Sequence, residues 1–465
     1  MTRIECISPI DGQVVARRET IDPKKLATVI ADAKAAQKEW AAVPLAKRKE
    51  YIVRFMKEMQ AMNQEIIPEL AMQMGRPVRY GGEWRGFEER INFMLKYADQ
   101  ALADRRPPDA DEKEKQGFVR FQSREPLGIV FVVAPWNYPY LTANATITPA
   151  LLAGNAVFLK HAAQTLLVGD RFQQAFDRAG LPKGLFTNLV LDHGQTEQLL
   201  QSGNVNFVNF TGSVQGGRII ERAAAGTFAG VGLELGGKDP AYVLPDANIT
   251  AAVDGLVDGA FYNSGQCCCG IERIYVHEKV YDAFVAGAVA LTSKYVLGNP
   301  LDEKTTLGPM ANKRFATLVR DQVAAARAGG AVAHIDQKLF PADDGQGTYV
   351  MPQVLTAVNH QMAVMKDETF GPVVGIMKVK NDDEAVALMN DSPYGLTASL
   401  WTNDVDHAER IGRRVETGTL FMNRCDYVDP GLGWTGVKDT GRGISGGMLG
   451  FEQVTRPKNF HLKKL

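Results

Sequence analysis

The segment GIVFVVA at residues 128–134 is a short apolar run of the length and β-branched content typical of a buried strand. Three more segments of similar character follow along the chain: AVFLK (156–160), TNLVL (187–191) and VNFVNF (205–210). Helical patterns separate such segments, as at residues 166–179 and 216–225. Alternating strands and helices predict right-handed βαβ units, hence a mostly parallel sheet with a ligand site at the carboxyl ends of its strands.

A second alternating series begins near residue 240 and extends to about residue 424. It contains two expected strands and an expected helix: RIYV (273–276), VVGIM (373–377) and residues 281–296. We therefore predict a fold of the α/β class with two parallel-sheet domains that join near Gly236 and Gly237.

The region in front of the first series has a different composition. Residues 21–105 are rich in Ala, Lys, Glu, Met and Arg, carry apolar residues at helical spacing, and predict several helices. Residues 107–115 are polar, begin with two prolines and include a charge run, which indicates a boundary. No period of about 20–50 residues is visible, so a solenoid is not indicated.

Composition and charge narrow the class of protein. The 465 residues include 52 Lys and Arg against 53 Asp and Glu, a formal charge of −1 that favours neither a nucleic acid nor an anionic membrane as partner. The N-terminus lacks an apolar signal region, and no apolar run of membrane-spanning length follows, so we expect a cytoplasmic protein. The five cysteines include three adjacent ones at residues 267–269, which suits buried or reactive thiols better than disulfides or zinc ligands.

Three local patterns carry chemistry. The segment TGS (211–213) leads into GGRI (216–219), a glycine-bearing strand-to-helix turn that could face a phosphate, although plain turn geometry explains it as well. The segment FYNSGQCCC (261–269) places cysteines in a glycine-containing loop, where one thiol can be a nucleophile and two can be small buried residues. Upstream, Glu234 in LELGGK (233–238) is either a salt-bridge partner or a base with a raised pKa.

Together with PWNYP (135–139) and ETFGP (368–372), these motifs resemble those of the aldehyde dehydrogenase superfamily over essentially the whole chain. The resemblance is to the NAD(P)-dependent, hydrolytic type. It implies a Rossmann-like cofactor domain, a catalytic domain and a small β oligomerisation arm. The cofactor domain would comprise residues 1–107 and 127–236, and the catalytic domain residues 237–440. The oligomerisation arm would comprise residues 108–126 and 454–465. A homodimer or homotetramer is expected.

By position, the resemblance implies three catalytic residues. Cys268 matches the nucleophile, Asn137 matches the amide of the oxyanion hole, and Glu234 matches the base that activates water. The implied reaction oxidises a small-molecule aldehyde to a carboxylic acid through a thiohemiacetal and a thioester on Cys268. Three alternatives are an acylating enzyme that uses CoA, a catalytically silent NAD-binding scaffold protein and a cysteine hydrolase. None of the seven histidines lies in a motif that would support the last.

The resemblance also implies which residues bind NAD or NADP: Lys160 at the adenosine ribose, Gly212, Ser213 and Gly217 at the pyrophosphate, Trp136 in the same cleft, and Glu368 and Phe370 at the nicotinamide end. For Gly217 and Trp136, packing alone is an equal explanation. The family's usual Lys-Pro-x-Glu is replaced by KHAA (160–163), so Ala163 stands where a carboxylate often binds the ribose 2′-hydroxyl. NADP is therefore admissible, with Lys160 as a cation near its 2′-phosphate and His161 as a weaker candidate.

The substrate is the least determined feature. Five residues match channel-lining positions of the family: Tyr138, Thr142, Tyr262, Tyr427 and Val428. They include no clear anion anchor, and Arg424 is as easily a structural hydrogen-bond donor as a carboxylate ligand. We therefore expect aliphatic or aromatic aldehydes rather than semialdehydes. The segment GWTGVKDTG (433–441) departs from the family pattern and leaves the local channel structure open.

Overall fold

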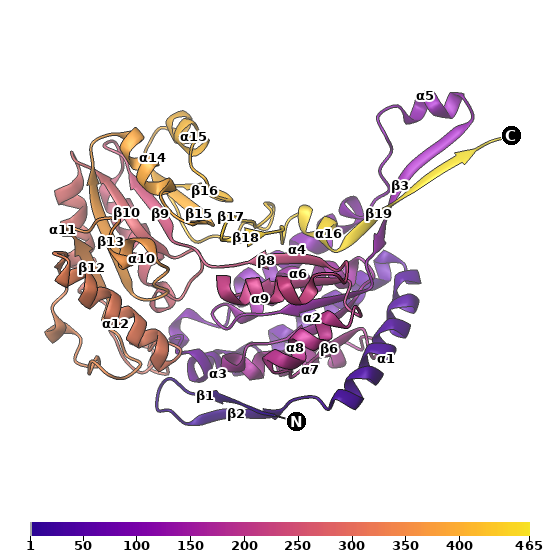
Figure 1. Cartoon of the computed structure of the whole chain (residues 1–465), viewed down its shortest axis with the longest axis horizontal. Coiled ribbons are helices and arrows are strands. Elements are labelled where there is room, and N and C mark those ends of the chain that lie inside the picture. The colour runs from indigo at the N-terminus through magenta and orange to yellow at the C-terminus, as the bar shows by residue number, and fades with distance from the viewer. Residues whose placement is uncertain (1) are drawn as a thin grey trace.

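The computed structural model describes residues 2–465 and contains two sheet-centred lobes and a projecting ribbon (Figure 1). The first lobe has a six-stranded sheet of order β18-β8-β7-β4-β5-β6, in which only β18 is antiparallel to its neighbour. Its strands are β4 (Ile129–Val133), β5 (Ala156–Lys160), β6 (Phe186–Asn188), β7 (Phe207–Thr211), β8 (Gly230–Glu234) and β18 (Gly441–Arg442). The expected mostly parallel sheet is confirmed.

One strand of this sheet is shorter than expected. We expected a strand at residues 187–191, but β6 ends at Asn188. The amide of Leu189 still donates to the Leu159 carbonyl, at 2.7 Å, while the Val190 carbonyl accepts from the amide of Ile21, at 2.9 Å. The chain therefore leaves the sheet to contact the segment that precedes the first helix.

Helices cover this sheet on both sides: α1 (Pro23–Ala42), α2 (Leu45–Ala61), α3 (Asn63–Met74), α4 (Trp84–Ala101), α6 (Pro139–Leu152), α7 (Leu166–Arg178), α8 (His193–Gln201), α9 (Val214–Ala224) and α16 (Leu449–Gln453). The helical character expected for residues 21–105 is confirmed. Aromatic packing holds α2 on α7, since the Phe55 and Phe176 rings stack with centroids 3.9 Å apart. A hairpin of β1 (Arg3–Ile7) and β2 (Val14–Glu19) flanks the lobe.

The second lobe has a seven-stranded sheet of order β11-β12-β13-β10-β9-β15-β16. Its strands are β9 (Asp239–Val243), β10 (Ile271–His277), β11 (Val332–Ala333), β12 (Gln353–Thr356), β13 (Val373–Val379), β15 (Thr397–Trp401) and β16 (Thr419–Met422). Its helices are α10 (Ile249–Phe261), α11 (Tyr281–Thr292), α12 (Lys313–Ala328), α13 (Ala363–Lys366), α14 (Asp382–Asn390) and α15 (Val405–Gly412). The chain passes from the first sheet to the second between Glu234 and Asp239.

Helix α11 ends four residues before the expected position of 296. The reason is a long-range contact, because the Val296 amide donates to Thr306 Oγ1 at 2.8 Å and Leu297 forms a bridge with Leu307. Short elements complete the two lobes and their junction: η1 (Val78–Tyr80), η2 (Ala163–Thr165), η3 (Tyr262–Gly265), η4 (Gln337–Leu339), β14 (Tyr394–Gly395) and β17 (Val437–Lys438).

A two-stranded antiparallel ribbon extends away from both lobes (Figure 1). It pairs β3 (Phe118–Pro126) with β19 (Thr455–Lys463), and α5 (Ala110–Lys115) lies at its end. The rings of Phe121 and Phe460 stack across it with centroids 4.5 Å apart. Leu462 near the tip is half exposed, so the ribbon presents apolar surface away from the body of the molecule.

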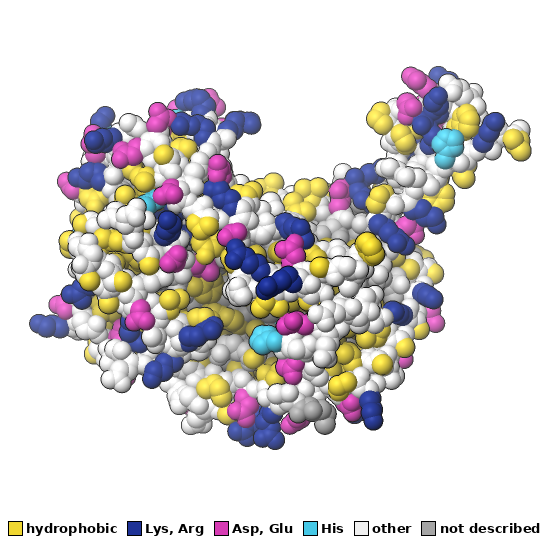
Figure 2. Space-filling view, viewed as in Figure 1, with side chains coloured by type: hydrophobic (Ala, Val, Ile, Leu, Met, Phe, Trp, Pro, Cys, Tyr) yellow, Lys and Arg dark blue, Asp and Glu magenta, His cyan; other side chains and the backbone are white. Residues whose placement is uncertain are grey.

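The surface mixes charges of both signs. Figure 2 shows acidic and basic side chains interspersed over one face of the molecule. Among residues 2–465, no helix has the length and apolar character needed to cross a bilayer.

Candidate active site

Two cavities meet at Cys268, at the junction of the two lobes. One, which we call the tyrosine cavity, has a volume of about 150 Å³ and is lined by Tyr138 and Tyr262 among others. The other, the tryptophan cavity, has a volume of about 340 Å³ and contains Trp136. Four residues line both cavities: Thr211, Glu234, Leu235 and Cys268. The structure therefore brings two of the three expected catalytic side chains to the boundary between two spaces.

The loop that carries Cys268 is held in an unusual backbone conformation. Asn263 and Ser264 have φ values of 53° and 58°, and Gly265 has a φ of 69°. A Cβ atom at Gly265 would lie 2.2 Å from the Gly371 carbonyl oxygen, so this position needs glycine. The side chain of Gln266 is buried, and its Oε1 accepts a 2.8 Å hydrogen bond from the Ala311 amide. The loop is thus fixed on both sides of the Gly-Gln pair.

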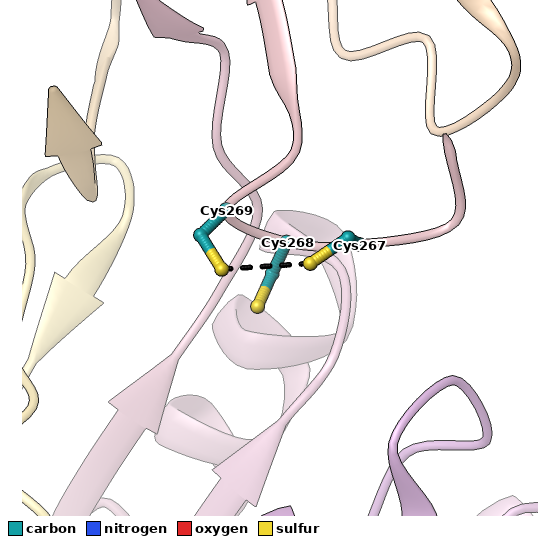
Figure 3. A group of neighbouring side chains, drawn as sticks. All are labelled: Cys267, Cys268 and Cys269. Carbon is teal, nitrogen blue, oxygen red and sulfur yellow. Dashed lines mark hydrogen bonds between the residues drawn. The ribbon is translucent and has the colours of Figure 1, made fainter. Parts of the chain in front are cut away.

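The three adjacent thiols of this loop point in different directions. Figure 3 shows the sulfurs of Cys267 and Cys269 facing each other, while the sulfur of Cys268 lies to one side. The Cys267 and Cys269 sulfurs are 3.4 Å apart, and both residues are buried. Cys268 is only partly buried and is the one of the three that reaches both cavities. All three thiols are free.

The interaction with Cys267, together with burial, raises the pKa of the Cys268 thiol above its ordinary value. A raised pKa disfavours the thiolate form of Cys268. Because the thiolate is the nucleophilic form, it needs a proton acceptor at the time of reaction.

Asn137 lies in the loop between β4 and α6 and is tied to the cysteine loop. Its Nδ2 donates to the Gln266 carbonyl at 3.3 Å, and its own backbone carbonyl accepts from Arg76 and, at 3.4 Å, from Asn263 Nδ2. A side-chain amide has two N–H groups, so one remains available to another acceptor. Asn137 and Cys268 are thus held on adjoining, mutually bonded loops.

A buried ion pair that the sequence analysis missed fixes this arrangement. Arg76 Nη1 lies 2.7 Å from Glu83 Oε1, and both side chains are almost fully buried. Glu83 Oε2 accepts hydrogen bonds from the amides of Tyr140 and Leu141, at 3.1 and 2.9 Å, which begin α6. No local motif indicates the role of this pair, because the groups that it holds, at Asn137, Tyr140 and Asn263, come from distant segments of the chain.

Glu234 ends β8 and has an incompletely satisfied carboxylate. Its Oε2 accepts from Thr211 Oγ1 at 3.4 Å, whereas its Oε1 is buried and has no hydrogen-bond partner within residues 2–465. Burial raises the pKa of this carboxyl group above its ordinary value. Glu234 lines both cavities, and a carboxylate that is not fully hydrogen-bonded is suited to accept a proton from water or from a thiol.

The tryptophan cavity contains most of the expected cofactor-binding residues: Trp136, Lys160, Gly212, Ser213, Glu368 and Phe370. The Trp136 ring stacks on Phe315 with centroids 5.3 Å apart and contacts the Phe370 ring edge-on at 5.7 Å. Gly217 lies outside the lining, and a Cβ atom there would lie 2.6 Å from a Leu235 methyl group. Packing against Leu235 favours glycine at this position, and contact with the pyrophosphate stays a prediction.

Glu368 lies opposite the glycines that connect the two lobes. Its Oε1 accepts a 3.0 Å hydrogen bond from the Gly237 amide, and burial raises the pKa of its carboxyl group to about 7. The amides of Thr369 and Phe370 donate to Glu272, at 2.8 and 2.9 Å, and Glu272 is paired with buried Lys238. The segment that carries Glu368 is therefore anchored to the second sheet.

Lys160 lies at the far end of the tryptophan cavity, where a further cavity of about 300 Å³ begins. Lys160 has no acidic partner within residues 2–465, and Ala163, which is exposed, lines the further cavity. Burial lowers the pKa of His161 to about 3, and its ring nitrogens lie 3.0 Å from Thr165 Oγ1 and 3.3 Å from the Pro139 carbonyl. The expectation that His161 could supply a second cation is therefore wrong.

Comparisons with known proteins agree with this geometry. The model of the aldehyde dehydrogenase family matches residues 1–460. The chain belongs to the aldehyde dehydrogenase family. It is 32% identical over 463 residues to a betaine aldehyde dehydrogenase of Sinorhizobium fredii, covering 99% of this chain and 94% of that protein.

Two similar solved structures carry different cofactors. A succinic semialdehyde dehydrogenase from Streptococcus pyogenes in complex with NADP+ has a TM-score of 0.93 and 27% identity, covering 99% of this chain and all of that one. The protein PnpE in complex with NAD has a TM-score of 0.91 and 28% identity, covering 99% and 94%. The chain is an NAD(P)-dependent aldehyde dehydrogenase, as the sequence motifs predicted.

In this aldehyde dehydrogenase, the tyrosine cavity contains four of the five residues expected to line a substrate channel: Tyr138, Thr142, Tyr262 and Val428. Tyr427 lies outside the lining, where its hydroxyl donates to Glu89 at 2.8 Å. Arg424 also lies outside, with its guanidinium 3.8 Å from the centre of the Tyr427 ring. The lining instead includes Arg90 of α4, which the sequence analysis did not single out.

Proposed function

We propose that this enzyme oxidises an aldehyde to the carboxylic acid through a covalent thioester on Cys268. The observation that supports this most directly is the position of Cys268, which lines both cavities together with Glu234, whose Oε1 has no hydrogen-bond partner within residues 2–465. The aldehyde would occupy the tyrosine cavity and NAD(P) the tryptophan cavity. When bound, NAD(P)+ supplies the hydride acceptor.

In the first step, the Cys268 thiol loses its proton to solvent and its sulfur attacks the aldehyde carbonyl carbon. As the S–C bond forms, the π electrons of the carbonyl move to its oxygen, which bears the negative charge of the resulting thiohemiacetal anion. The free N–H of the Asn137 side chain and the backbone N–H of Cys268 would stabilise this charge. Removing one such donor typically lowers the rate by about 10²–10³.

In the second step, the thioester left by hydride transfer is hydrolysed. Glu234 takes a proton from water, the resulting hydroxide attacks the thioester carbonyl, and the carboxylic acid leaves as Cys268 regains its sulfur electron pair. A positioned general base contributes about 10²–10⁴ to such a step. This role favours hydrolysis over transfer to CoA, because acylating relatives commonly lack this glutamate.

The residues of the tryptophan cavity fit a dinucleotide. Gly212 and Ser213 lie at the N-terminus of α9, where backbone N–H groups would face the pyrophosphate. Lys160, without an acidic partner, would bind near the adenosine ribose, and Glu368 would bind the nicotinamide ribose. Trp136 and Phe370 would form the walls beside the nicotinamide end.

We further propose that residues 1–107 and 127–236 form the cofactor domain and residues 237–440 the catalytic domain. Residues 108–126 and 454–465 would be an oligomerisation arm that joins two or four copies. Its projection from the lobes and its half-exposed Leu462 support this. The five free cysteines favour a reducing, cytoplasmic location.

The test is NAD(P)H formation with a panel of aldehydes and both cofactors. We expect stoichiometric production of NAD(P)H and carboxylic acid, without a requirement for CoA. A catalytically silent scaffold would bind the cofactor and produce neither. An acylating enzyme would produce NAD(P)H only when CoA is added, and a cysteine hydrolase would act without any nicotinamide.

A further inference from the structure

Arg90 is a cation in the tyrosine cavity that lacks a protein partner. Its side chain extends from α4, is only partly exposed, and lines the cavity beside Tyr138 and Cys269. Within residues 2–465 its guanidinium forms no hydrogen bond and no ion pair. Arg76 illustrates the contrast, since its guanidinium is buried and fully engaged with Glu83, Asn137 and Asn263.

The glutamates nearest to Arg90 are committed elsewhere. Glu83 is paired with Arg76 and also accepts from two amides of α6. Glu89 is exposed and accepts from the Tyr427 hydroxyl. Glu234 contributes negative charge at longer range, but its role as the base requires it to remain unpaired.

Two aspartates also line the cavity and do not neutralise Arg90. Burial raises the pKa of Asp426 to about 7, so this group carries only part of a charge at neutral pH. Asp429 is exposed, and its Oδ1 accepts a 2.7 Å hydrogen bond from the Gly431 amide. Burial lowers the pKa of Arg90, yet a guanidinium remains protonated at any physiological pH. Arg90 is therefore the permanent positive charge of the cavity.

The remainder of the lining is suited to hydrocarbon. It includes Met94, Leu141, Leu396 and Trp434. A partly buried cation in such surroundings is costly unless an anion binds to it, and a guanidinium binds a carboxylate with two parallel hydrogen bonds. The cavity volume of about 150 Å³ favours a short chain and a planar carboxylate over a bulkier phosphate.

We propose that Arg90 binds a carboxylate at the end of the substrate remote from the aldehyde, so that the enzyme prefers short ω-oxo carboxylic acids to neutral aldehydes. This inference rests on the proposed function, since it assigns the aldehyde end to Cys268. The sequence analysis had favoured aliphatic or aromatic aldehydes over semialdehydes, and this inference reverses that preference. Arg90 was not recognised as an anion anchor because its helix lies far from the recognised motifs. An aldehyde bearing a trimethylammonium group should be a poor substrate for the same reason.

The experiment compares matched pairs of aldehydes: 4-oxobutanoate with butanal, and 6-oxohexanoate with hexanal. In the pair whose chain length suits the cavity better, we expect kcat/KM of the oxo acid to be at least about tenfold higher than that of the neutral aldehyde. Arg90→Met, which keeps the length without the charge, should lower kcat/KM for the acid by about 10–100-fold, mainly through KM. The neutral partner should change less than about threefold. Arg90→Lys should restore part of the loss, and Arg85→Met, at an exposed position of the same helix, should have no effect.

A second measurement does not depend on turnover. Succinate should slow the alkylation of Cys268 by iodoacetamide, butyrate should do so much less, and the difference should disappear in Arg90→Met. Equal protection by the two acids, or equal losses for acidic and neutral aldehydes in Arg90→Met, would overturn the inference. If no aldehyde is oxidised by the unmodified enzyme, the proposed function fails, and the succinate measurement still decides whether Arg90 binds a carboxylate.

Discussion

Replacing Glu234 by glutamine separates the two chemical steps of the proposed mechanism. The substitution keeps the size of the side chain and removes its ability to accept a proton. Glu234 Oε1 is buried without a partner, so exchanging this acid for a neutral amide should not lower the free energy of unfolding. We therefore expect a folded enzyme that forms the thioester and hydrolyses it slowly.

The magnitude follows from the role of a general base. Loss of such a base lowers a rate by about 10²–10⁴, or about 2.7–5.4 kcal/mol at 1.36 kcal/mol per factor of ten. The pH profile has a definite sign. Glu234 is active when deprotonated and its pKa is raised, so the hydrolysis rate should fall with decreasing pH already above the ordinary value of 4.5. This acidic limb should be absent from the steady-state rate of Glu234→Gln.

The assay is rapid mixing of enzyme with aldehyde and NAD(P)+. Glu234→Gln should release one NAD(P)H per active site in a burst and then turn over slowly, and mass spectrometry should find the acyl group on Cys268. Glu112→Gln, at an exposed position of α5, serves as the control with unchanged turnover. Absence of the burst with cofactor still bound would refute the reasoning, because Glu234 would then act earlier, as the acceptor of the Cys268 proton.

Three further predictions address the cofactor, the scaffold and the assembly. Ala163→Glu should lower kcat/KM for NADP+ more than for NAD+, because a carboxylate would repel the 2′-phosphate. Equal changes of kcat/KM for the two cofactors would show that other residues bind the adenosine ribose and determine the cofactor preference. Glu83→Ala leaves Arg76 as an uncompensated buried charge and should lower the free energy of unfolding by about 3–5 kcal/mol in urea titrations, whereas a loss below 1 kcal/mol would contradict the buried pair. Light scattering at micromolar concentration should find a dimer or tetramer that deletion of residues 455–465 dissociates, and a monodisperse monomer of the full chain would speak against the arm.

Strands β4, β5, β7, β10 and β13 were predictable from the sequence because each is a local run rich in apolar residues. The segment at 128–134 is wholly recognisable in this way, and β4 occupies Ile129–Val133. Element ends were less predictable, since β6 and α11 end where Val190 and Val296 form long-range contacts. Period and composition contain no information about such contacts.

The residues of the active site divide in the same way, into those that a local motif identifies and those that only long-range contacts bring together. Cys268, Glu234 and Asn137 lie in short motifs, so a resemblance could locate them. Arg90 and the Arg76–Glu83 pair act through contacts between segments that no motif connects.

His161 is a residue to which the sequence analysis assigned a role that its surroundings in the fold do not support. It was expected as a cation from its place next to Lys160, but the fold buries it against Thr165 and the Pro139 carbonyl. Its charge state thus depends on burial that the sequence does not display.

The identity of the nucleophile is the central claim, and the most direct measurement is the aldehyde-dependent NAD(P)H production of single cysteine variants. Cys268→Ala should have no measurable activity while its affinity for NAD(P) stays near that of the unmodified enzyme, because the sulfur supplies the covalent step and the tryptophan cavity holds the cofactor. Cys267→Ala and Cys269→Ala should retain most of the activity, since their sulfurs face each other instead of reaching both cavities. Retention of most activity by Cys268→Ala would contradict the account.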